Sequence, residues 1–242
     1  MTKIKIPILM YHSISSMPRS TVMRGLHVPL NRFKFQMFLL KLFGYKGVSI
    51  SQLEPYLNGK KGKVVGITFD DGYKNNLINA APILKEYNFT ATCYLVSNRI
   101  GSTNIWDISK GIPEIDLMDE FEIKKWIEMG MEIGAHTSSH ADLNLLEDNE
   151  IRREIKDCKS SLESLFNVEI NDFCYPYGHF NNEVVKFVKK TGFMTATTML
   201  RGRANEKTNM LKLPRIPITH HTLPHLFVAK LFTSYEDKRG PY

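Results

Sequence analysis

Two short strings of the sequence combine side chains that bind metal ions with side chains that move protons. The first, Thr68-Phe69-Asp70-Asp71-Gly72, places two adjacent carboxylates and a glycine directly after an apolar, β-rich run. The second, His136-Thr137-Ser138-Ser139-His140, places two histidines at positions i and i+4 after another short apolar run. Together the strings offer three ligands for a metal ion and one spare carboxylate. This is the inventory of a hydrolytic site of the zinc type.

The spacing within these strings suits metal-assisted hydrolysis. Two imidazoles four residues apart on one helical turn have Cβ atoms roughly 5–6 Å apart, so both can reach one ion at the ~2.0–2.1 Å that zinc prefers. One carboxylate completes a three-ligand set and leaves a position for water, whose pKa falls from about 15.7 towards 7 on the metal. The second carboxylate can accept a proton from that water as general base. Adjacent ionised aspartates repel each other, so the pair is expected with a cation.

Each string also has an ordinary alternative. An Asp-Asp-Gly sequence after a strand is most often a turn, because Asp and Gly favour turn conformations. A His-x-x-x-His sequence is more often a coincidence, or a surface or core pair, than a metal site. Their joint occurrence, each at the end of a predicted buried strand, favours the metal site.

The two strings resemble the first two motifs of the NodB-type polysaccharide deacetylases, carbohydrate esterase family 4. In that family the first Asp of the first motif is the general base and the second is a metal ligand, which implies these roles for Asp70 and Asp71. The second motif supplies two metal-binding histidines, which implies that role for His136 and His140. The resemblance extends over residues 6–218 and implies a divalent metal cofactor, with zinc expected.

A third string, Cys174-Tyr175-Pro176-Tyr177-Gly178, resembles the family's third motif, which is usually Arg-x-Pro-Tyr. There the backbone amide of the Tyr helps to hold the oxyanion of the tetrahedral intermediate, which implies that role for Tyr177. Cys174 replaces the motif's Arg, which orients the general base. Arg215 could take its place by reaching Asp70 from a neighbouring strand, or could form an ordinary salt bridge. The family's fourth motif, with Asp and Trp, has no match.

The family's fifth motif, a strand ending in a histidine that acts as general acid, is missing from the C-terminal part of the chain. Instead an apolar run near the N-terminus, Ile6-Pro7-Ile8-Leu9-Met10-Tyr11-His12, resembles the fifth motif in a new position. A subgroup that includes the deacetylases of poly-β-1,6-N-acetylglucosamine has the same Met-Tyr-His opening. His12 is therefore the candidate for the acid that protonates the leaving amine, although it could instead hydrogen-bond a loop. His220 and His221 are the rival candidates.

Strand-like and helix-like segments alternate along the chain, which indicates a parallel sheet with helical crossovers. This many units predicts an α/β fold in one domain, residues 1–242: a distorted, incomplete (β/α)7 barrel. The predicted strands are 6–11, 47–50, 63–69, 90–96, 131–135, 172–175, 194–198 and 212–218, and the predicted helices are 31–43, 75–87, 120–129, 147–166 and 182–190.

The candidate residues fall at or just after the C-terminal ends of predicted strands, and in such barrels the active site lies on that face. These residues are His12, Asp70, Asp71, His136 and Tyr177. The long irregular stretch 98–118 is expected to form the rim of a substrate groove, with Trp106 or Tyr94 as a platform for a sugar ring. Trp106 could equally be a buried anchor, whereas Trp126 is assigned to the core.

The composition limits the setting in which the protein works. The 242 residues are 43% hydrophobic, as in one globular domain, and the formal net charge of +7 favours an acidic partner such as an anionic glycan or a membrane surface. The basic residues form no dense run, so no nucleic-acid partner is expected. No apolar segment approaches the ~20 residues of a membrane span. Three cysteines without a CxxC spacing favour reduced thiols and a cytoplasmic protein, with a trimmed export signal as the alternative.

The residues and the resemblance together predict a metal-dependent hydrolase. It would remove the N-acetyl group from an N-acetylhexosamine in a glycan or glycan precursor and release acetate. Two alternatives remain at this point: a catalytically silent glycan-binding relative, which the missing motif Arg and the missing fourth motif make plausible, and a hydrolase of a non-sugar amide on the same scaffold. The sequence leaves open which sugar and linkage are used, which metal is bound and which oligomeric state forms.

Overall fold

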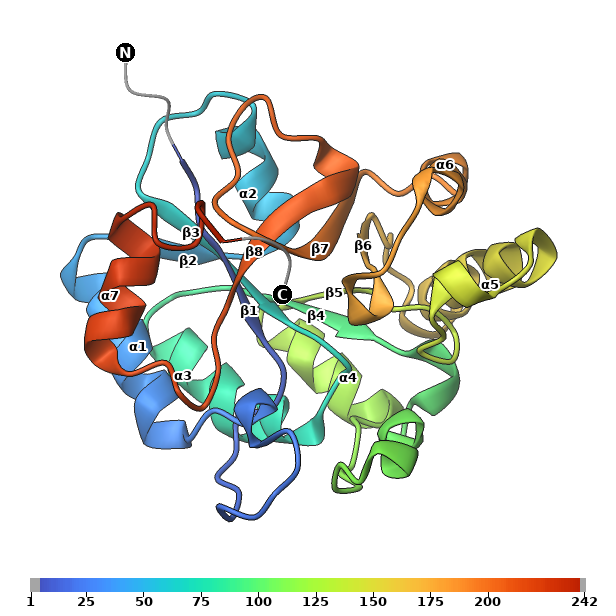
Figure 1. Ribbon diagram of the computed structural model, residues 1–242, viewed down its shortest axis with the longest axis horizontal. Helices are drawn as coiled ribbons and strands as arrows, with labels where there is room; N and C mark the ends of the chain where they lie inside the picture. The colour runs from blue at the N-terminus through green and yellow to red at the C-terminus, as the bar shows by residue number, and fades with distance from the viewer. Residues whose placement is uncertain (1–4, 240–242) are drawn as a thin grey trace.

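Eight parallel strands form a single sheet in the computed structural model, which describes residues 5–239. The strands are β1 (Ile8–Tyr11), β2 (Lys46–Val48), β3 (Val64–Phe69), β4 (Thr92–Leu95), β5 (Glu132–Ala135), β6 (Asp172–Cys174), β7 (Thr195–Arg201) and β8 (Leu213–Pro217). The α-helices are α1 (Leu30–Leu42), α2 (Ile50–Leu57), α3 (Ala81–Glu86), α4 (Glu120–Glu128), α5 (Asp148–Phe166), α6 (Asn182–Lys190) and α7 (Pro224–Phe232). The helices surround the sheet, and α1 and α7 lie side by side on one flank (Figure 1).

Seven of these strands close into a ring. The order of neighbours is β1-β8-β7-β6-β5-β4-β3, and β1 pairs again with β3, with Ile8 opposite Gly66 and Tyr11 opposite Phe69. β2 lies outside the ring and pairs with the N-terminal half of β3. The predicted α/β barrel is confirmed: its ring has one strand fewer than a complete (β/α)8 barrel.

Side chains fill the interior of the ring, so the strands are buried on both faces. Every residue of β1, β3 and β4 is buried, as expected for parallel strands covered by helices. Tyr94 of β4 is fully buried and lies against Gly134, where an added Cβ atom would stand 2.6 Å from the Tyr94 ring. The expectation that Tyr94 is a sugar platform is therefore wrong, because its ring belongs to the barrel interior. Trp126 is fully buried in the core, as predicted.

The helices differ from the prediction in three places. The helix predicted over 75–87 is divided, because Asn76–Ala80 forms a π-helical turn before α3 begins. Neither α2 nor α7 is among the predicted helices. Proline inside a segment weighs against a helix, and α2 contains Pro55, whereas Pro224 stands at the start of α7, where proline is favoured. No described helix is long and apolar enough to cross a bilayer.

A buried carboxyl group begins β6, at the N-terminal end of the barrel. Asp172 is 4% exposed, and its burial raises its pKa to about 7. The carboxylates of Glu132 and Glu54 act in the same direction. The charge of Lys159 opposes them, as does the hydroxyl of Thr195, which donates to Asp172 Oδ1 at 2.5 Å. The folded protein therefore favours the protonated form of Asp172.

We expect the substitution Asp172→Asn to remove a pH dependence of stability. Asp172 holds its proton more tightly in the folded state, so its contribution to stability is greatest below the unfolded pKa of 3.8 and falls until the pH reaches about 7. The total loss is on the order of 4 kcal/mol. Because the asparagine does not ionise, the stability of the variant relative to the native protein should rise from about pH 4 to about pH 7 and then level off. Urea denaturation across this range measures the difference, and a difference independent of pH would contradict the raised pKa.

Candidate active site

A cavity of about 390 Å³ lies at the C-terminal ends of the strands. Its wall includes all six residues that the sequence analysis selects for catalysis or metal binding: His12, Asp70, Asp71, His136, His140 and Tyr177. Each of them lies in the segment that follows β1, β3, β5 or β6. The predicted convergence of the motifs on one face of the barrel is confirmed, while their chemical roles stay predictions.

The turns that carry these side chains have backbone conformations that residues other than glycine rarely adopt. Positive φ values between 57° and 74° occur at Asp71, Thr137, His140 and Tyr177. The expectation that His136 and His140 lie on one helical turn is therefore wrong. Positive φ at Thr137 and His140 turns this segment into an irregular loop. The two imidazoles nevertheless meet, with ring centroids 4.9 Å apart.

Glu154 of α5 holds the loop between the two histidines. Its carboxylate accepts hydrogen bonds from the backbone N–H of Ser139 at 2.9 Å and from the Ser139 hydroxyl at 2.7 Å. Its carbonyl oxygen accepts a third from the N–H of Ser138 at 3.1 Å. A residue in a sparsely populated conformation persists only where its surroundings fix it, and these bonds supply that constraint.

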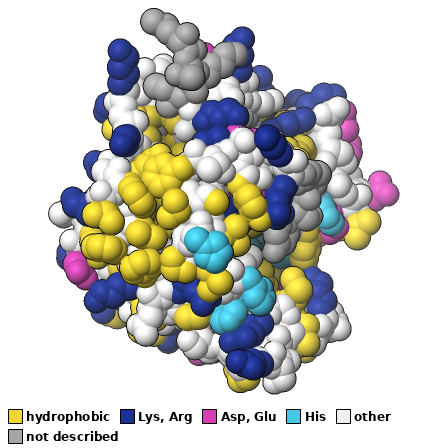
Figure 2. All heavy atoms as spheres, turned by 60° about the vertical axis from the view of Figure 1, so that its left-hand side comes forward, with side chains coloured by type: hydrophobic (Ala, Val, Ile, Leu, Met, Phe, Trp, Pro, Cys, Tyr) yellow, Lys and Arg dark blue, Asp and Glu magenta, His cyan; other side chains and the backbone are white. Residues whose placement is uncertain are grey.

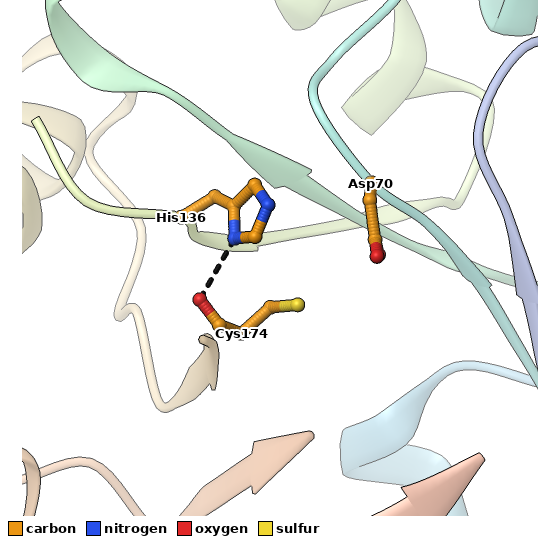
Figure 3. Close-up of side chains that lie close together, drawn as sticks. All are labelled: Asp70, His136 and Cys174. Atoms are coloured by element: carbon orange, nitrogen blue, oxygen red, sulfur yellow. Dashed lines mark hydrogen bonds between the residues drawn. The ribbon is translucent and has the colours of Figure 1, made fainter. Parts of the chain in front are cut away.

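Asp71, His136 and His140 place their ligand atoms within 4.8 Å of one another. Asp71 Oδ1 lies 3.5 Å from Nε2 of His136 and 3.3 Å from Nε2 of His140, yet this buried oxygen has no well-aligned hydrogen-bond partner. His136 donates from Nδ1 to the carbonyl oxygen of Cys174 at 2.7 Å, as Figure 3 shows, which leaves Nε2 free to act as a ligand. A divalent cation fits this group, because it would satisfy the orphaned oxygen and both imidazole nitrogens at once.

The charge and the ligand types of this group suit zinc. Imidazole nitrogens and a carboxylate oxygen are the ligands of catalytic zinc sites, in which three protein ligands leave room for water or substrate. Burial raises the pKa of Asp71, but the imidazoles of His136 and His140 lower it more, so the pKa lies well below its ordinary value. Asp71 therefore brings a full negative charge to the group.

A second group of possible ligands, Asp70, His136 and Cys174, does not fit a metal ion (Figure 3). Arg215 donates from Nη1 to Oδ1 of Asp70 at 2.6 Å and from Nη2 to Oδ2 at 2.8 Å, so both carboxylate oxygens are engaged. Nη2 of Arg215 also lies 3.2 Å from Sγ of Cys174. A cation placed among these three residues would stand against the guanidinium charge.

Arg215 makes the contact with Asp70 that the sequence analysis left open. It reaches Asp70 from β8, which is separated from β3 by β1, so the two strands are not neighbours as expected. The guanidinium is buried, with Nη1 also bonded to Oγ1 of Thr68 at 3.1 Å and Nε bonded to the carbonyl of Thr198 at 2.9 Å. Burial raises the pKa of Asp70, but Arg215 lowers it more, so the pKa stays below its ordinary value. The small side chain of Cys174 lets Nη2 approach.

Three histidines are candidates for the general acid. Within the described residues, only His12 borders Asp70. Its Nε2 lies 3.9 Å from Oδ2 of Asp70, and its side chain lines the cavity. The backbone carbonyl of His12 accepts a hydrogen bond from Nδ2 of Asn76 at 2.8 Å, which ties it to the π-helical turn. His220 and His221 lie beyond the cavity wall, which reaches only the preceding Thr219. The geometry thus favours His12 as the acid.

The stretch 98–118 forms part of the cavity wall, as predicted. The ring of Trp106 stacks on His140 at 4.5 Å between centroids, with 12° between the planes. Tyr177 meets the same imidazole edge-on at 4.6 Å. Lys110 places Nζ 4.2 Å from the centre of the Tyr177 ring. Trp106 is half-buried in the wall, and its role as a sugar platform stays a prediction.

Another, apolar part of the wall is not predicted from the sequence. It comes from the loop between β1 and α1 and from the ends of β7 and β8: Val22, Met23, Leu26, Met199 and Ile218. The position of these segments along the chain could have marked them. In this architecture, the segments that follow the C-terminal ends of barrel strands form the functional loops.

Comparison with known proteins identifies the class of protein. The family described as polysaccharide deacetylase matches residues 58–196. The chain is 32% identical over 218 residues to the "Putative polysaccharide deacetylase YxkH" of Bacillus subtilis (strain 168), spanning 89% of this chain and 72% of that protein. It is 27% identical over 214 residues to a poly-beta-1,6-N-acetyl-D-glucosamine N-deacetylase of Staphylococcus epidermidis, spanning 86% and 73%. A solved structure, the Streptococcus pyogenes deacetylase PplD in complex with acetate, is similar with a TM-score of 0.82 and 27% identity, over 95% of this chain and 99% of that one. The chain belongs to the polysaccharide deacetylase family, as the three motifs predicted.

We expect Arg215→Met to lower the free energy of unfolding by about 3–5 kcal/mol, because it leaves the Asp70 carboxylate buried without its cation. The double variant Asp70→Asn/Arg215→Met should be more stable than Arg215→Met, because the uncharged amide leaves no buried charge without a partner. Urea denaturation at neutral pH compares the two variants. Equal stability of the two variants would show that the unpaired charge of Asp70 is not the cause of the lost stability.

Proposed function

We propose that this protein removes the N-acetyl group from an N-acetylhexosamine in a glycan or glycan precursor by metal-dependent hydrolysis. The observation that carries the proposal is the placement of an ionised carboxylate, Asp70, beside the ligand group of Asp71, His136 and His140. Membership of the polysaccharide deacetylase family supports a sugar N-acetyl group as the target. So does the similarity to a poly-beta-1,6-N-acetyl-D-glucosamine N-deacetylase.

In this proposal Asp71, His136 and His140 hold the ion, with zinc as the first choice. When bound, the ion supplies Lewis acidity, which lowers the pKa of water and polarises a carbonyl oxygen. The chain prepares the site for it: the Cys174 carbonyl fixes the orientation of the His136 ring, and Trp106 stacks on the His140 ring. Both imidazoles are therefore oriented by the protein before any ligand arrives.

Asp70 and His12 divide the proton transfers between them. Asp70, kept ionised and fixed by Arg215, takes a proton from the attacking water as its oxygen bonds to the acetyl carbon. The carbon–nitrogen bond then breaks, and His12 gives a proton to the departing amine. His12 lies 3.9 Å from Asp70, close enough for both residues to serve opposite sides of one amide group. The products are acetate and a free amino sugar.

Tyr177 completes the proposal through its backbone. The hydrogen bonds of its turn are donated by the N–H groups of Gly178 and His179 to the carbonyls of Tyr175 and Pro176. These bonds do not use the N–H of Tyr177, which we assign to the oxygen that becomes negative in the tetrahedral intermediate. A donor fixed in advance at that position is often the largest contribution to rate in acyl transfer.

The catalytically silent alternative loses one of its two supports. Arg215 supplies a guanidinium to Asp70 in place of the motif arginine, while the fourth motif stays without a match. A non-sugar amide as substrate has no specific observation in its favour. The proposal of a cytoplasmic location continues to rest on the cysteines, and Cys93, Cys158 and Cys174 are free and buried.

The substitution Asp70→Asn should reduce acetate release from N-acetylglucosamine oligomers by roughly 10²–10⁴-fold, because the amide cannot accept the proton of the water. Zinc content, measured on the purified variant, should stay close to that of the native protein, since Asp71 and the two histidines are intact. Asp157→Asn, an exposed aspartate of α5, is the matched control and should behave as native. Near-native turnover in Asp70→Asn would refute Asp70 as the base.

The substitution His12→Gln tests the acid. We expect turnover to fall on the order of a hundredfold or more, with bound zinc unchanged, because glutamine cannot protonate the leaving amine. An activated substrate, an aryl acetate whose leaving group needs no proton, should be hydrolysed by the variant at close to the native rate. His221→Gln serves as the control outside the cavity. If His12→Gln loses the amide and the activated ester equally, His12 is not the acid.

A further inference from the structure

Three basic side chains, Arg24, Arg32 and His220, belong to segments that lie close to the wall of the cavity. Arg24 adjoins Gly25, which lines the cavity, and His220 follows Thr219, which lines it on a different segment. Arg32 lies in the first turn of α1. We refer to Arg24, Arg32 and His220 as the cationic rim.

Hydrogen bonds bring the three segments of the cationic rim together. The N–H of His220 donates to the carbonyl of Gly25 at 3.0 Å. Gln36, one helical turn after Arg32, donates from Nε2 to the carbonyl of Thr222 at 3.4 Å. The turn that carries His220 is therefore packed between the Arg24 loop and α1. Burial lowers the pKa of His220, and the charges of Arg24 and Arg32 lower it further, which agrees with this proximity.

The arginine charges of the cationic rim have no acidic partner in the part of the chain that the structure describes, although Nε of Arg24 donates to the carbonyl of Met17 at 3.0 Å. No carboxylate in residues 5–239 lies within ion-pair distance of Arg24 or Arg32, whereas Arg203 pairs with Asp237. Nη1 of Arg32 and Nδ1 of His220 are buried without a hydrogen-bond partner. Nη1 of Arg32 always carries hydrogens, and a buried donor without a partner is costly and calls for a ligand or solvent.

The N-terminal end of α1 adds to the positive potential around the cationic rim. The helix begins after Pro29 with no side-chain cap and has no acidic residue in its first turn. Its unpaired N–H groups and its dipole therefore act in the same direction as the charge of Arg32. On the flank of α1 and α7, Figure 2 shows histidines next to Lys or Arg side chains at the border of a hydrophobic area.

We propose that the cationic rim binds a phosphate group carried by the N-acetylhexosamine whose acetamide enters the cavity. A phosphate ester carries about −1.5 to −2 charges at neutral pH, which matches two arginines and a helix N-terminus better than a single carboxylate does. Arginine also binds phosphate through two parallel hydrogen bonds. The proposal rests on the deacetylase function proposed above and names its substrate class: a phosphorylated sugar, with the phosphate held outside the cavity while the acetamide lies within it.

The test compares the zinc-loaded enzyme on N-acetylglucosamine 1-phosphate and on N-acetylglucosamine. The native protein should have the higher kcat/KM on the phosphorylated sugar, by about tenfold or more. The variant Arg24→Gln/Arg32→Gln should lose this preference, chiefly through KM. Lys189→Gln/Lys190→Gln, which removes the same charge from the end of α6, is the control and should keep the preference. UDP-N-acetylglucosamine forms a second arm, which distinguishes a diphosphate from a monophosphate.

A binding measurement separates this proposal from the deacetylase function. Inorganic phosphate is titrated into native protein and both double variants at equal zinc loading, and its phosphorus NMR line width is followed. Weaker binding by Arg24→Gln/Arg32→Gln alone supports the cationic rim even if no sugar is deacetylated. Equal phosphorus line widths for all three proteins would overturn the cationic rim as a phosphate site. So would an equal ratio of kcat/KM on the phosphorylated and unphosphorylated sugars in all three proteins.

Discussion

The buried ion pair between Arg215 and Asp70 is the interaction on which the site depends. Two adjacent ionised aspartates repel each other in a region with little water. The structure resolves this by giving each carboxylate a different partner: Asp70 receives the guanidinium fork, while Asp71 faces His136 and His140. Both carboxylates can then be ionised at the same time, because a different cationic or imidazole partner lowers the pKa of each one.

The closure of the barrel explains how a histidine near the N-terminus takes part in the same site. β1 lies between β8 and β3, with Tyr11 opposite Phe69, and the N–H of Asp70 donates to the carbonyl of Tyr11 at 3.0 Å. His12 and Asp70 are the next residues on two hydrogen-bonded strands and so emerge at the same level. A histidine at either end of the sequence could reach this place, provided that its strand fills the gap beside β3.

The sequence predicted what depends on local pattern, and it left open or missed what depends on distant contacts. The strands and the three motifs follow from short apolar runs and the residues that end them. The bond between Arg215 and Asp70 joins residues 145 positions apart, and only the closed barrel brings them together. The irregular loop at His140 likewise follows from its bonds to Glu154, which outweigh the helical spacing of the histidines. The burial of Tyr94 depends on Gly134 of the neighbouring strand, which no local pattern reveals.

The most direct test of this account is acetate release from N-acetylglucosamine oligomers by protein stripped of metal and then refilled with one equivalent of zinc. The account predicts no release from the stripped protein and full recovery with zinc. Release that persists without metal would contradict the assignment of Asp71, His136 and His140 as the ligands of a required ion. Stoichiometric zinc without any release would contradict an N-acetylated sugar oligomer as the substrate.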